Sequence, residues 1–307
     1  MKVIRKGRTS KSVQLGEIDT PNVSSEVLAA GINPVDLAIA GGKLPFRKLD
    51  AKATLGFEGV AQTADGDVVY FSAPRPPDGS FAERVSLDGA ETASVPDGLD
   101  PALAAAVGVP GIAAWSALFD AGKFAAGDRV LVLGGTGTVG RIAAQAAIAE
   151  GASLVAGTAR NDEGIADLSS IGVVPVDISS ASTTSTQLRE ASADGFDVVI
   201  DTLWGPPLAA TVEHLRTGAR VAQVGNSAGA ETELSAPAFR NRGVTFAGHS
   251  NFLLTAEQRR VAYEKVAEYA SNGKIDVPLS TIGLEEFPDF WARMADGNAR
   301  GKTVLVP

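Results

Sequence analysis

The chain has no cysteine, and His214 and His249 are the only histidines among its 307 residues. The lack of cysteine excludes disulfide bonds, thiol catalysis and cysteine-ligated zinc, and it fits a reducing compartment. Two histidines far apart in the sequence argue against a catalytic zinc site, although carboxylates could complete one. We therefore expect no bound metal.

Basic charge and long apolar runs are also scarce. The net charge of −9 and the pI near 4.9 oppose binding to nucleic acids or anionic membranes, and so favour a small ligand. Residues 101–119 carry no charge, but they are rich in alanine and interrupted by Gly108-Val109-Pro110-Gly111, which predicts two buried helices rather than a membrane span. No apolar segment follows the basic residues at the N-terminus, so we expect a cytoplasmic protein without a signal peptide.

A glycine-rich turn is the most informative motif. An apolar strand at residues 130–133 runs into Gly134, and the spacing Gly135-x-Gly137-x-x-Gly140 then fits a dinucleotide pyrophosphate site at the start of a helix. A second apolar stretch at 153–158 completes one strand-helix-strand unit. The alternative is a glycine-rich turn without a ligand. The predicted contacts are Gly135, Thr136, Gly137, Thr138, Val139 and Gly140.

The same turn excludes two other classes of enzyme. Its spacing is that of a P-loop, but Arg141 and Ile142 stand where the lysine and the magnesium-binding hydroxyl belong, which argues against nucleotide hydrolysis. A short-chain dehydrogenase would carry the turn near its N-terminus and a Tyr-x-x-x-Lys pair later. The tyrosines of this chain lack that lysine.

The order of predicted elements indicates an α/β protein with two domains. Strands expected near residues 128–133, 153–158, 173–177, 196–201, 219–224 and 244–249 alternate mostly with helices, which predicts a doubly wound, six-stranded parallel Rossmann sheet. Residues 1–111 are mostly β, an amphipathic helix is expected near 256–271, and a last strand at 302–306 is expected to pair with the first domain. We predict domains at 1–111 and 112–250, with 251–307 returning to the first. The polar stretch 179–186 is expected to be a loop and a helix cap.

The end of the second Rossmann strand bears on the choice of cofactor. It reads Thr158-Ala159-Arg160-Asn161, without the acid that binds a ribose 2′-hydroxyl and with a guanidinium suited to a 2′-phosphate. NADP(H) is therefore favoured over NAD(H). The alternative is a solvated Arg160, with Asp162 or Glu163 reaching the ribose.

A set of motifs in fixed order resembles the zinc-independent quinone oxidoreductases of the medium-chain dehydrogenase/reductase superfamily. The resemblance covers nearly the whole chain and implies a GroES-like catalytic domain, NADPH in a cleft, and often a homodimer paired through the last Rossmann strand. The motifs, besides the glycine turn, are Gly31-Ile32-Asn33-Pro34-Val35-Asp36, Leu55-Gly56-Phe57-Glu58-Gly59, Gly111-Ile112-Ala113-Ala114-Trp115-Ser116-Ala117-Leu118, Val224-Gly225-Asn226-Ser227-Ala228-Gly229 and Gly301-Lys302-Thr303-Val304-Leu305.

Departures from the superfamily matter as much as the matches. Asn33 and Phe57 stand where zinc alcohol dehydrogenases have Cys and His ligands, and the cysteine loop for structural zinc is missing. Tyrosines common in the zinc-free branch are replaced by Ala38 and Leu44. With Leu44, Pro45 and Phe46 nearby, the resemblance implies a rather apolar pocket without a phenolic proton donor.

Few polar residues remain as candidates for chemistry. Asn33 is expected nearest the nicotinamide or the substrate carbonyl, where its amide could donate to an oxygen that gains charge; the alternative is an asparagine that stabilises the turn before Pro34. Asp36 and Glu58 are expected to hold the loop together; the alternative is that they act as acid or base. His249 with Asn251 could contact cofactor or substrate, or be a histidine satisfied by backbone.

The remaining candidates follow the strand ends. His214 is expected on a helical surface beside Glu213 and Arg216, and Trp204 either walls the cofactor groove or packs. Further predicted cofactor contacts are Thr158, Thr202, Gly225 and Asn226.

These observations predict a zinc-free oxidoreductase that transfers hydride from NADPH to a quinone or to the C=C bond of an α,β-unsaturated carbonyl compound. Such chemistry needs few acid-base side chains, because the cofactor supplies the hydride. The alternative is a redox-silent NADPH-binding sensor or structural protein of the same fold.

Overall fold

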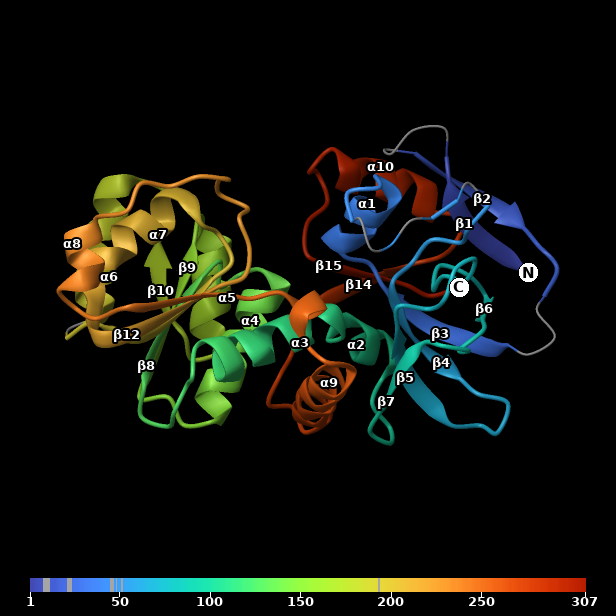
Figure 1. Ribbon diagram of the computed structural model, residues 1–307, viewed down its shortest axis with the longest axis horizontal. Coiled ribbons are helices and arrows are strands. Elements are labelled where there is room, and N and C mark those ends of the chain that lie inside the picture. Colours follow the sequence, from blue (N-terminus) through green and yellow to red (C-terminus); the bar gives the residue numbers. More distant parts are fainter. Residues whose placement is uncertain (8–11, 21–23, 45–46, 48, 51, 193) are drawn as a thin grey trace. The chain divides into compact units, whose positions relative to one another are not determined.

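The computed structural model describes residues 1–7, 12–20, 24–44, 47, 49–50, 52–192 and 194–307. The chain divides into two units (Figure 1): unit 1 comprises Met1–Val109 and Ala256–Pro307, and unit 2 comprises Pro110–Thr255. Unit 2 is thus inserted into the sequence of unit 1. The predicted domain boundaries after residues 111 and 250 stay a prediction, and the limits of the two units lie beside them.

Unit 2 is built on a six-stranded parallel sheet with the order β10-β9-β8-β11-β12-β13. The first strand, β8, has β9 on one side and β11 on the other, so the strand order reverses at this point, as in a Rossmann fold. The predicted fold class is confirmed. The strands are β8 (Arg129–Leu133), β9 (Leu154–Ala159), β10 (Val174–Asp177), β11 (Phe196–Asp201), β12 (Leu215–Gln223) and β13 (Thr245–Gly248).

The middle of each central strand is a run of buried branched aliphatic residues, 130–133 in β8 and 198–200 in β11, which is what a sheet covered by helices on both faces requires. Two sequence expectations need correction. Strand β12 begins at Leu215, earlier than expected, because its pairing with β11 continues past a register shift between Phe196 and Val198. The polar stretch 179–186 is helical from Ala181 onward. The helices are α4 (Thr138–Ala149), α5 (Asp162–Ser170), α6 (Ala181–Ser192), α7 (Gly205–Thr211) and α8 (Ala236–Arg240).

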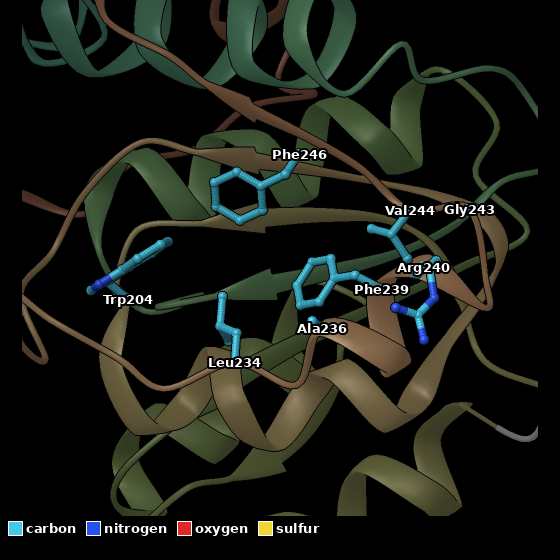
Figure 2. A pocket seen from close by; sticks show the side chains of 8 residues that line it. All are labelled: Trp204, Leu234, Ala236, Phe239, Arg240, Gly243, Val244 and Phe246. Atoms are coloured by element: carbon cyan, nitrogen blue, oxygen red, sulfur yellow. The ribbon is translucent and has the colours of Figure 1, made fainter.

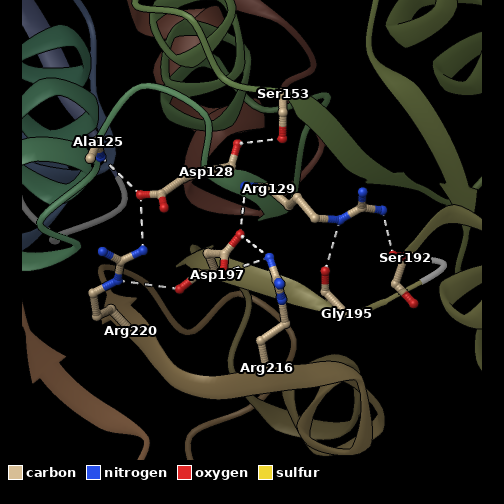
Figure 3. Close-up of polar contacts among 9 residues, drawn as sticks. All are labelled: Ala125, Asp128, Arg129, Ser153, Ser192, Gly195, Asp197, Arg216 and Arg220. Carbon is tan, nitrogen blue, oxygen red and sulfur yellow. Dashed lines mark hydrogen bonds and ion pairs between the residues drawn. The ribbon is translucent and has the colours of Figure 1, made fainter.

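An ionic network joins β8, β11 and β12 at their amino ends (Figure 3). Asp197 accepts from the backbone N–H of Arg129 at 2.9 Å and from Arg216 Nη1 at 3.2 Å. Arg220 Nη2 donates to Asp128 Oδ2 at 2.9 Å. These bonds stabilise the end of the sheet opposite the glycine turn and leave the carboxyl ends of the strands for a ligand.

Unit 1 is mostly β. Its larger sheet has the order β14-β15-β3-β4-β5-β7, with β6 also pairing with β3, and β1 and β2 form a separate antiparallel pair. The last strand, β15, runs antiparallel to β3, which confirms the expected pairing of the C-terminus with the first domain. The strands are β1 (Lys2–Lys6), β2 (Val13–Glu17), β3 (Ser25–Gly31), β4 (Glu58–Gln62), β5 (Val68–Ser72), β6 (Arg84–Val85), β7 (Glu91–Ser94), β14 (Leu279–Ile282) and β15 (Lys302–Leu305).

Helices complete unit 1 and the connection to unit 2. The uncharged run 101–119 forms two helices followed by a π-helix, which confirms the predicted pair of buried helices. Within the described part of the chain, no helix combines the length and apolarity needed to cross a bilayer. The helices are α1 (Pro34–Ala40), α2 (Pro101–Ala106), α3 (Val109–Ser116), the π-helix η1 (Ala117–Ala121), α9 (Ala256–Ser271) and α10 (Phe287–Ala295).

Candidate cofactor site and buried polar cluster

The glycine turn links β8 to α4 in unit 2. Gly134 has φ +86°, a conformation that favours glycine, and its N–H donates to Thr158 Oγ1 at 2.7 Å. A Cβ on Gly140 would collide with the carbonyl oxygen of Gly134, and a Cβ on Gly135 would lie 3.1 Å from the backbone of Gly157. The protein's own packing and backbone conformation therefore require glycine at Gly134 and Gly140 and leave little room for a side chain at Gly135.

Gly137 differs from them. It is exposed, has ordinary extended dihedral angles, and a Cβ there would meet only the Gly134 carbonyl oxygen, at 3.4 Å. Nothing inside the described protein demands glycine at this position. Gly137 is also the N-cap of α4 and offers no side chain to cap the helix, whose first turn carries no acid. The arrangement fits a diphosphate placed against the exposed backbone and the amino end of the helix.

Other predicted cofactor residues lie along the same edge of the sheet, because the carboxyl ends of parallel strands meet there. Thr202, after β11, donates through Oγ1 to the carbonyl oxygen of Leu133 at 2.7 Å. Gly225, after β12, donates from N–H to the carbonyl oxygen of Asp201 at 3.2 Å, and Asn226 beside it is exposed. Thr158 is buried under the turn, so its hydroxyl shapes the turn. Contact of these residues with a cofactor stays a prediction.

Arg160 is exposed and directly follows β9. Asn161, the next residue, caps α5 by accepting from Gly164 N–H at 2.9 Å. Asp162 and Glu163 stand in the first turn of α5 and are also exposed. The guanidinium thus stands at the strand end that a ribose phosphate would reach, with the two alternative carboxylates close to it in sequence.

His249 follows β13 at the same edge. Its backbone N–H donates to the carbonyl oxygen of Gln223 at 2.8 Å, and its Nε2 lies 3.1 Å from Asn251 Oδ1. Burial lowers the pKa of His249, opposed by the Asn251 hydrogen bond and by Asp120. The ring is therefore mostly neutral at pH 7. Contact of His249 and Asn251 with cofactor or substrate stays a prediction. His214, by contrast, is half-buried in a short 3₁₀ helix, whereas a surface helix was expected.

Sequence reasoning missed the role of Asp201. This carboxylate is fully buried at the end of β11, and Oδ1 accepts from the N–H groups of Leu203 and Trp204 at 2.9 and 2.8 Å. Burial raises its pKa, and Oδ2 has no partner among the described atoms. The two bonds hold Trp204 at φ +58°, which is unusual for an aromatic residue. The buried acid directly before an apolar turn was the available signal.

Trp204 packs on aromatic neighbours within unit 2 (Figure 2). Its ring meets Phe246 edge-on at a centroid distance of 5.6 Å, and Phe239 lies beyond Phe246 at 6.4 Å. These rings and Arg240 line an open groove of about 520 Å³ against β13. The packing alternative for Trp204 therefore agrees with the structure.

Asn33 lies in unit 1 within a buried polar cluster, which we define as Asn33, Asp36, Glu58, Tyr70 and Lys302. Asn33 Nδ2 donates to Glu58 Oε1 at 2.5 Å and to the carbonyl oxygen of Gly31 at 3.3 Å. Its Oδ1 accepts from Lys302 Nζ at 2.7 Å. Both amide protons are thus used by the protein, which favours the structural alternative over donation to a substrate.

The carboxylates of Asp36 and Glu58 accept hydrogen bonds from backbone N–H groups. Asp36 accepts from the N–H groups of Asn33 and Phe57 at 2.9 and 3.0 Å, so its expected role in holding the loop is confirmed. Glu58 accepts from Tyr70 Oη at 2.7 Å and from Val109 N–H at 2.5 Å, besides Asn33.

Burial dominates the titration of the cluster. It raises the pKa of Asp36 to about 7, against hydrogen bonds from Asn33 and Phe57 that lower it. It also raises the pKa of Glu58 and lowers that of Lys302. Lys302 is a cluster member that sequence reasoning overlooked; the signal was a lysine at the start of an otherwise apolar strand.

The remaining expectations for unit 1 concern the substrate pocket. Ala38 and Leu44 are half-buried, whereas Pro45 and Phe46 lie outside the described residues. Among the residues that the structure does describe, no group of three or more His, Cys, Asp and Glu is placed to hold a metal ion. That the protein binds no metal stays a prediction.

Comparison with known proteins supports the superfamily resemblance. Residues 173–305 match a family model described as zinc-binding dehydrogenase. A mycobacterial quinone oxidoreductase superposes with a TM-score of 0.84 at 21% identity over 100% of both chains, and a mycobacterial protein solved with NADPH superposes at 0.82 with 23% identity, again over 100% of both. The chain has the fold of the medium-chain dehydrogenase/reductase superfamily, as predicted.

Curated relatives are of two kinds. The chain is 29% identical, over 95% of its length, to a phenolphthiocerol/phthiocerol polyketide synthase of Mycobacterium tuberculosis, but it spans only 14% of that protein. It is 27% identical to the acrylyl-CoA reductase AcuI of Ruegeria pomeroyi, with 97% of this chain and 95% of that protein covered.

Proposed function

We propose that the chain is an oxidoreductase that binds NADP(H) at the glycine turn of unit 2 and reduces the C=C bond of an α,β-unsaturated carbonyl compound or a quinone. The observation that carries the proposal is Gly137, an exposed glycine that the protein's own packing does not require, at the uncapped amino end of α4. The solved relative with bound NADPH supports the choice of cofactor. NADPH, when bound, supplies the hydride.

Each part of the carboxyl edge has its own task in this proposal. The backbone of the turn and the first amides of α4 hold the diphosphate, and Arg160 pairs with the 2′-phosphate. Thr202, Gly225 and Asn226 line the continuation of the edge, where small or polar groups let a ligand approach the strand ends. His249, neutral at pH 7 and bonded to Asn251, offers a hydrogen bond without adding charge.

The relatives indicate two classes of substrate, an unsaturated thioester and a quinone. Acrylyl-CoA is an α,β-unsaturated thioester, and the relative that acts on it matches this chain nearly end to end. A quinone oxidoreductase has the same fold. We favour the unsaturated carbonyl compound, with a thioester as the first substrate to try, because the acrylyl-CoA relative is the more similar in sequence.

A pair of glycine substitutions tests the cofactor site. Gly137→Ala should lower the thermal unfolding midpoint only slightly, because the added methyl group has room and the cost is that of alanine at an N-cap, yet weaken NADPH binding roughly tenfold or more by filling the space of the diphosphate. Gly283→Ala, at another open glycine in unit 1, is the control and should change neither. Unchanged NADPH affinity in Gly137→Ala would remove the turn from the proposal.

Measuring NADPH turnover distinguishes an enzyme from a redox-silent NADPH-binding protein. NADPH consumption should be measured with a panel of quinones, enones and an enoyl thioester. We expect at least one class to be reduced. Saturable NADPH binding without consumption across the whole panel would instead support the redox-silent sensor or structural protein.

We also propose that two copies pair through β13, as the resemblance implies. Strand β13, Thr245–Gly248, lies at the edge of the sheet and carries neither charge nor proline, and Phe246 is 39% exposed. The opposite edge, β10, is protected by Pro175 and Asp177. Sedimentation should show a dimer that Phe246→Glu dissociates and that Val174→Glu, on β10, leaves intact. A monomer at all concentrations would contradict this.

A further inference from the structure

The chain passes between the two units at two places. It leaves unit 1 after Val109, the first residue of α3, and it returns at Ala256, the first residue of α9. Both the leaving and the returning segment are held inside unit 1, and each has a contact that leads to one buried carboxylate, that of Glu58 in β4.

The leaving segment touches Glu58 directly. Glu58 Oε2 accepts from the Val109 N–H at 2.5 Å. Two glycines leave space for the carboxylate: a Cβ on Gly108 would collide with Oε2, and one on Gly31 would lie 2.5 Å from Oε1. Neither glycine has a positive φ. Close packing, not the backbone conformation, therefore requires glycine at both positions, and the Glu58 carboxylate is the nearest neighbour at each; the Ala105 carbonyl oxygen at Gly31 and the Tyr70 ring at Gly108 would also be struck.

Glu58 is connected to the returning segment through two stacked tyrosine rings. Tyr70 donates to Glu58 Oε2 at 2.7 Å, and its ring stacks on Tyr263 of α9 with a centroid distance of 3.9 Å and an interplanar angle of 14°. One turn earlier in α9, Arg259 forms a two-pronged ion pair with Glu91 of β7, at 2.7 and 2.6 Å. The start of α9 is thus fixed to the same unit.

We propose that Glu58 is a hinge anchor: it ties both connecting segments to unit 1, so that motion of the units relative to one another takes place beyond Val109 and before Ala256. A charged acceptor in a dry interior holds an N–H more firmly than a carbonyl does. Glu58 is fully buried and accepts from three donors. The role goes beyond the proposed function and requires no contact with cofactor or substrate. Glu58 is in this sense a positioning residue.

Hydrogen exchange of the full-length protein tests the anchor directly. Glu58→Gln preserves size but replaces a charged acceptor with a neutral one: its single oxygen can still accept from Tyr70 and Val109 at the position of Oε2, whereas its nitrogen cannot accept from Asn33. We expect exchange at the Val109 amide to become roughly 3- to 30-fold faster, the range for replacing a charged acceptor with a neutral one, while β3 and β4 keep their protection.

A neighbouring acid provides the matched control. Asp36→Asn alters the same cluster but a different backbone, so it should speed exchange at Asn33 and Phe57 and leave Val109 protected. Tyr70→Phe keeps the carboxylate and the ring stacked on Tyr263 but removes the hydrogen bond that joins this ring to Glu58, so it should speed exchange at residues 256–262 more than at Val109. This milder variant also tests the proposal if Glu58→Gln does not fold.

A distance measurement reports the hinge itself. Because the chain has no cysteine, Glu190→Cys in unit 2 and Asn272→Cys in unit 1, both exposed, can carry a single pair of spin labels. Glu58→Gln should broaden the distance distribution between them, and Asp36→Asn should not. Unchanged exchange at Val109, an equal rise in exchange throughout unit 1, or an unchanged distance distribution would overturn the proposal.

Discussion

The substitution Asn33→Ala distinguishes a structural role of this asparagine from a catalytic role. The amide of Asn33 bridges two buried charged groups: Oδ1 accepts from Lys302 Nζ at 2.7 Å, and Nδ2 donates to Glu58 Oε1 at 2.5 Å. Alanine removes both bonds. Lys302 then keeps its bond to the carbonyl oxygen of Ile32, at 3.2 Å, and Glu58 keeps those from Tyr70 and Val109.

The expected cost follows from these contacts. A hydrogen bond to a charged group contributes about 1.5–3 kcal/mol, so losing two predicts a fall of about 3–6 kcal/mol in the free energy of unfolding of unit 1. Domains are stable by about 5–15 kcal/mol, so the change is large. A purely catalytic donor would instead lower turnover roughly 10- to 1,000-fold at unchanged stability.

Urea unfolding distinguishes the two. Trp291, buried in unit 1, reports that unit alone once Trp115 and Trp204 are replaced by phenylalanine. Asn272→Ala, at an exposed asparagine of unit 1, should stay within about 0.5 kcal/mol of the parent. An Asn33→Ala protein of parental stability that has lost turnover would refute the structural assignment and restore the catalytic one.

Three further predictions concern the cofactor, pH and metal. Arg160→Ala should weaken NADPH binding by about 1–3 kcal/mol and leave NADH binding unchanged, which titration calorimetry would measure. The control is Arg189→Ala, at another exposed arginine of unit 2. Equal affinities of the parent protein for NADPH and NADH would contradict the assignment. The folded-state pKa of Asp36, about 7, lies above its ordinary value near 4, so folding favours the protonated acid. The free energy of unfolding of unit 1 should therefore fall as the pH rises from about 4 to about 7, by at most about 1.4 kcal/mol for each pH unit. Asp36→Asn should flatten this trend. Elemental analysis should find no stoichiometric zinc, and chelators should leave activity unchanged; one tightly held zinc per chain would show that ligands other than cysteine suffice.

The Rossmann unit could be predicted from sequence because its information is local. Each strand is an apolar run bounded by turn residues, and the glycine spacing fixes where the first helix begins. The start of β12 could not be predicted, because Leu215 joins the sheet by pairing with Phe196 of β11 before a register shift, and regular pairing resumes only at Arg220. The helical start at Ala181 was hidden in a run of serine and threonine, whose helical signal is weak.

The buried polar cluster was less predictable. Its members come from α1, β4, β5 and β15 and from the residue before α1. Lys302 and Asn33, which are hydrogen-bonded, lie near opposite ends of the sequence. Single-sequence patterns report the polarity of a residue but not which distant partner satisfies it. Asn33 therefore looked available for a substrate, whereas the fold gives both of its amide protons to protein acceptors.

The fate of the hydride tests the central claim most directly. The protein should be incubated with NADPH deuterated on the transferred position and with an enoyl thioester such as acrylyl-CoA, and the product analysed by mass spectrometry and NMR. The account predicts a saturated thioester with one deuterium on the β-carbon, formed in parallel with NADPH oxidation and reduced by Gly137→Ala. Tight NADPH binding with no deuterium in any enone, thioester or quinone product would contradict it.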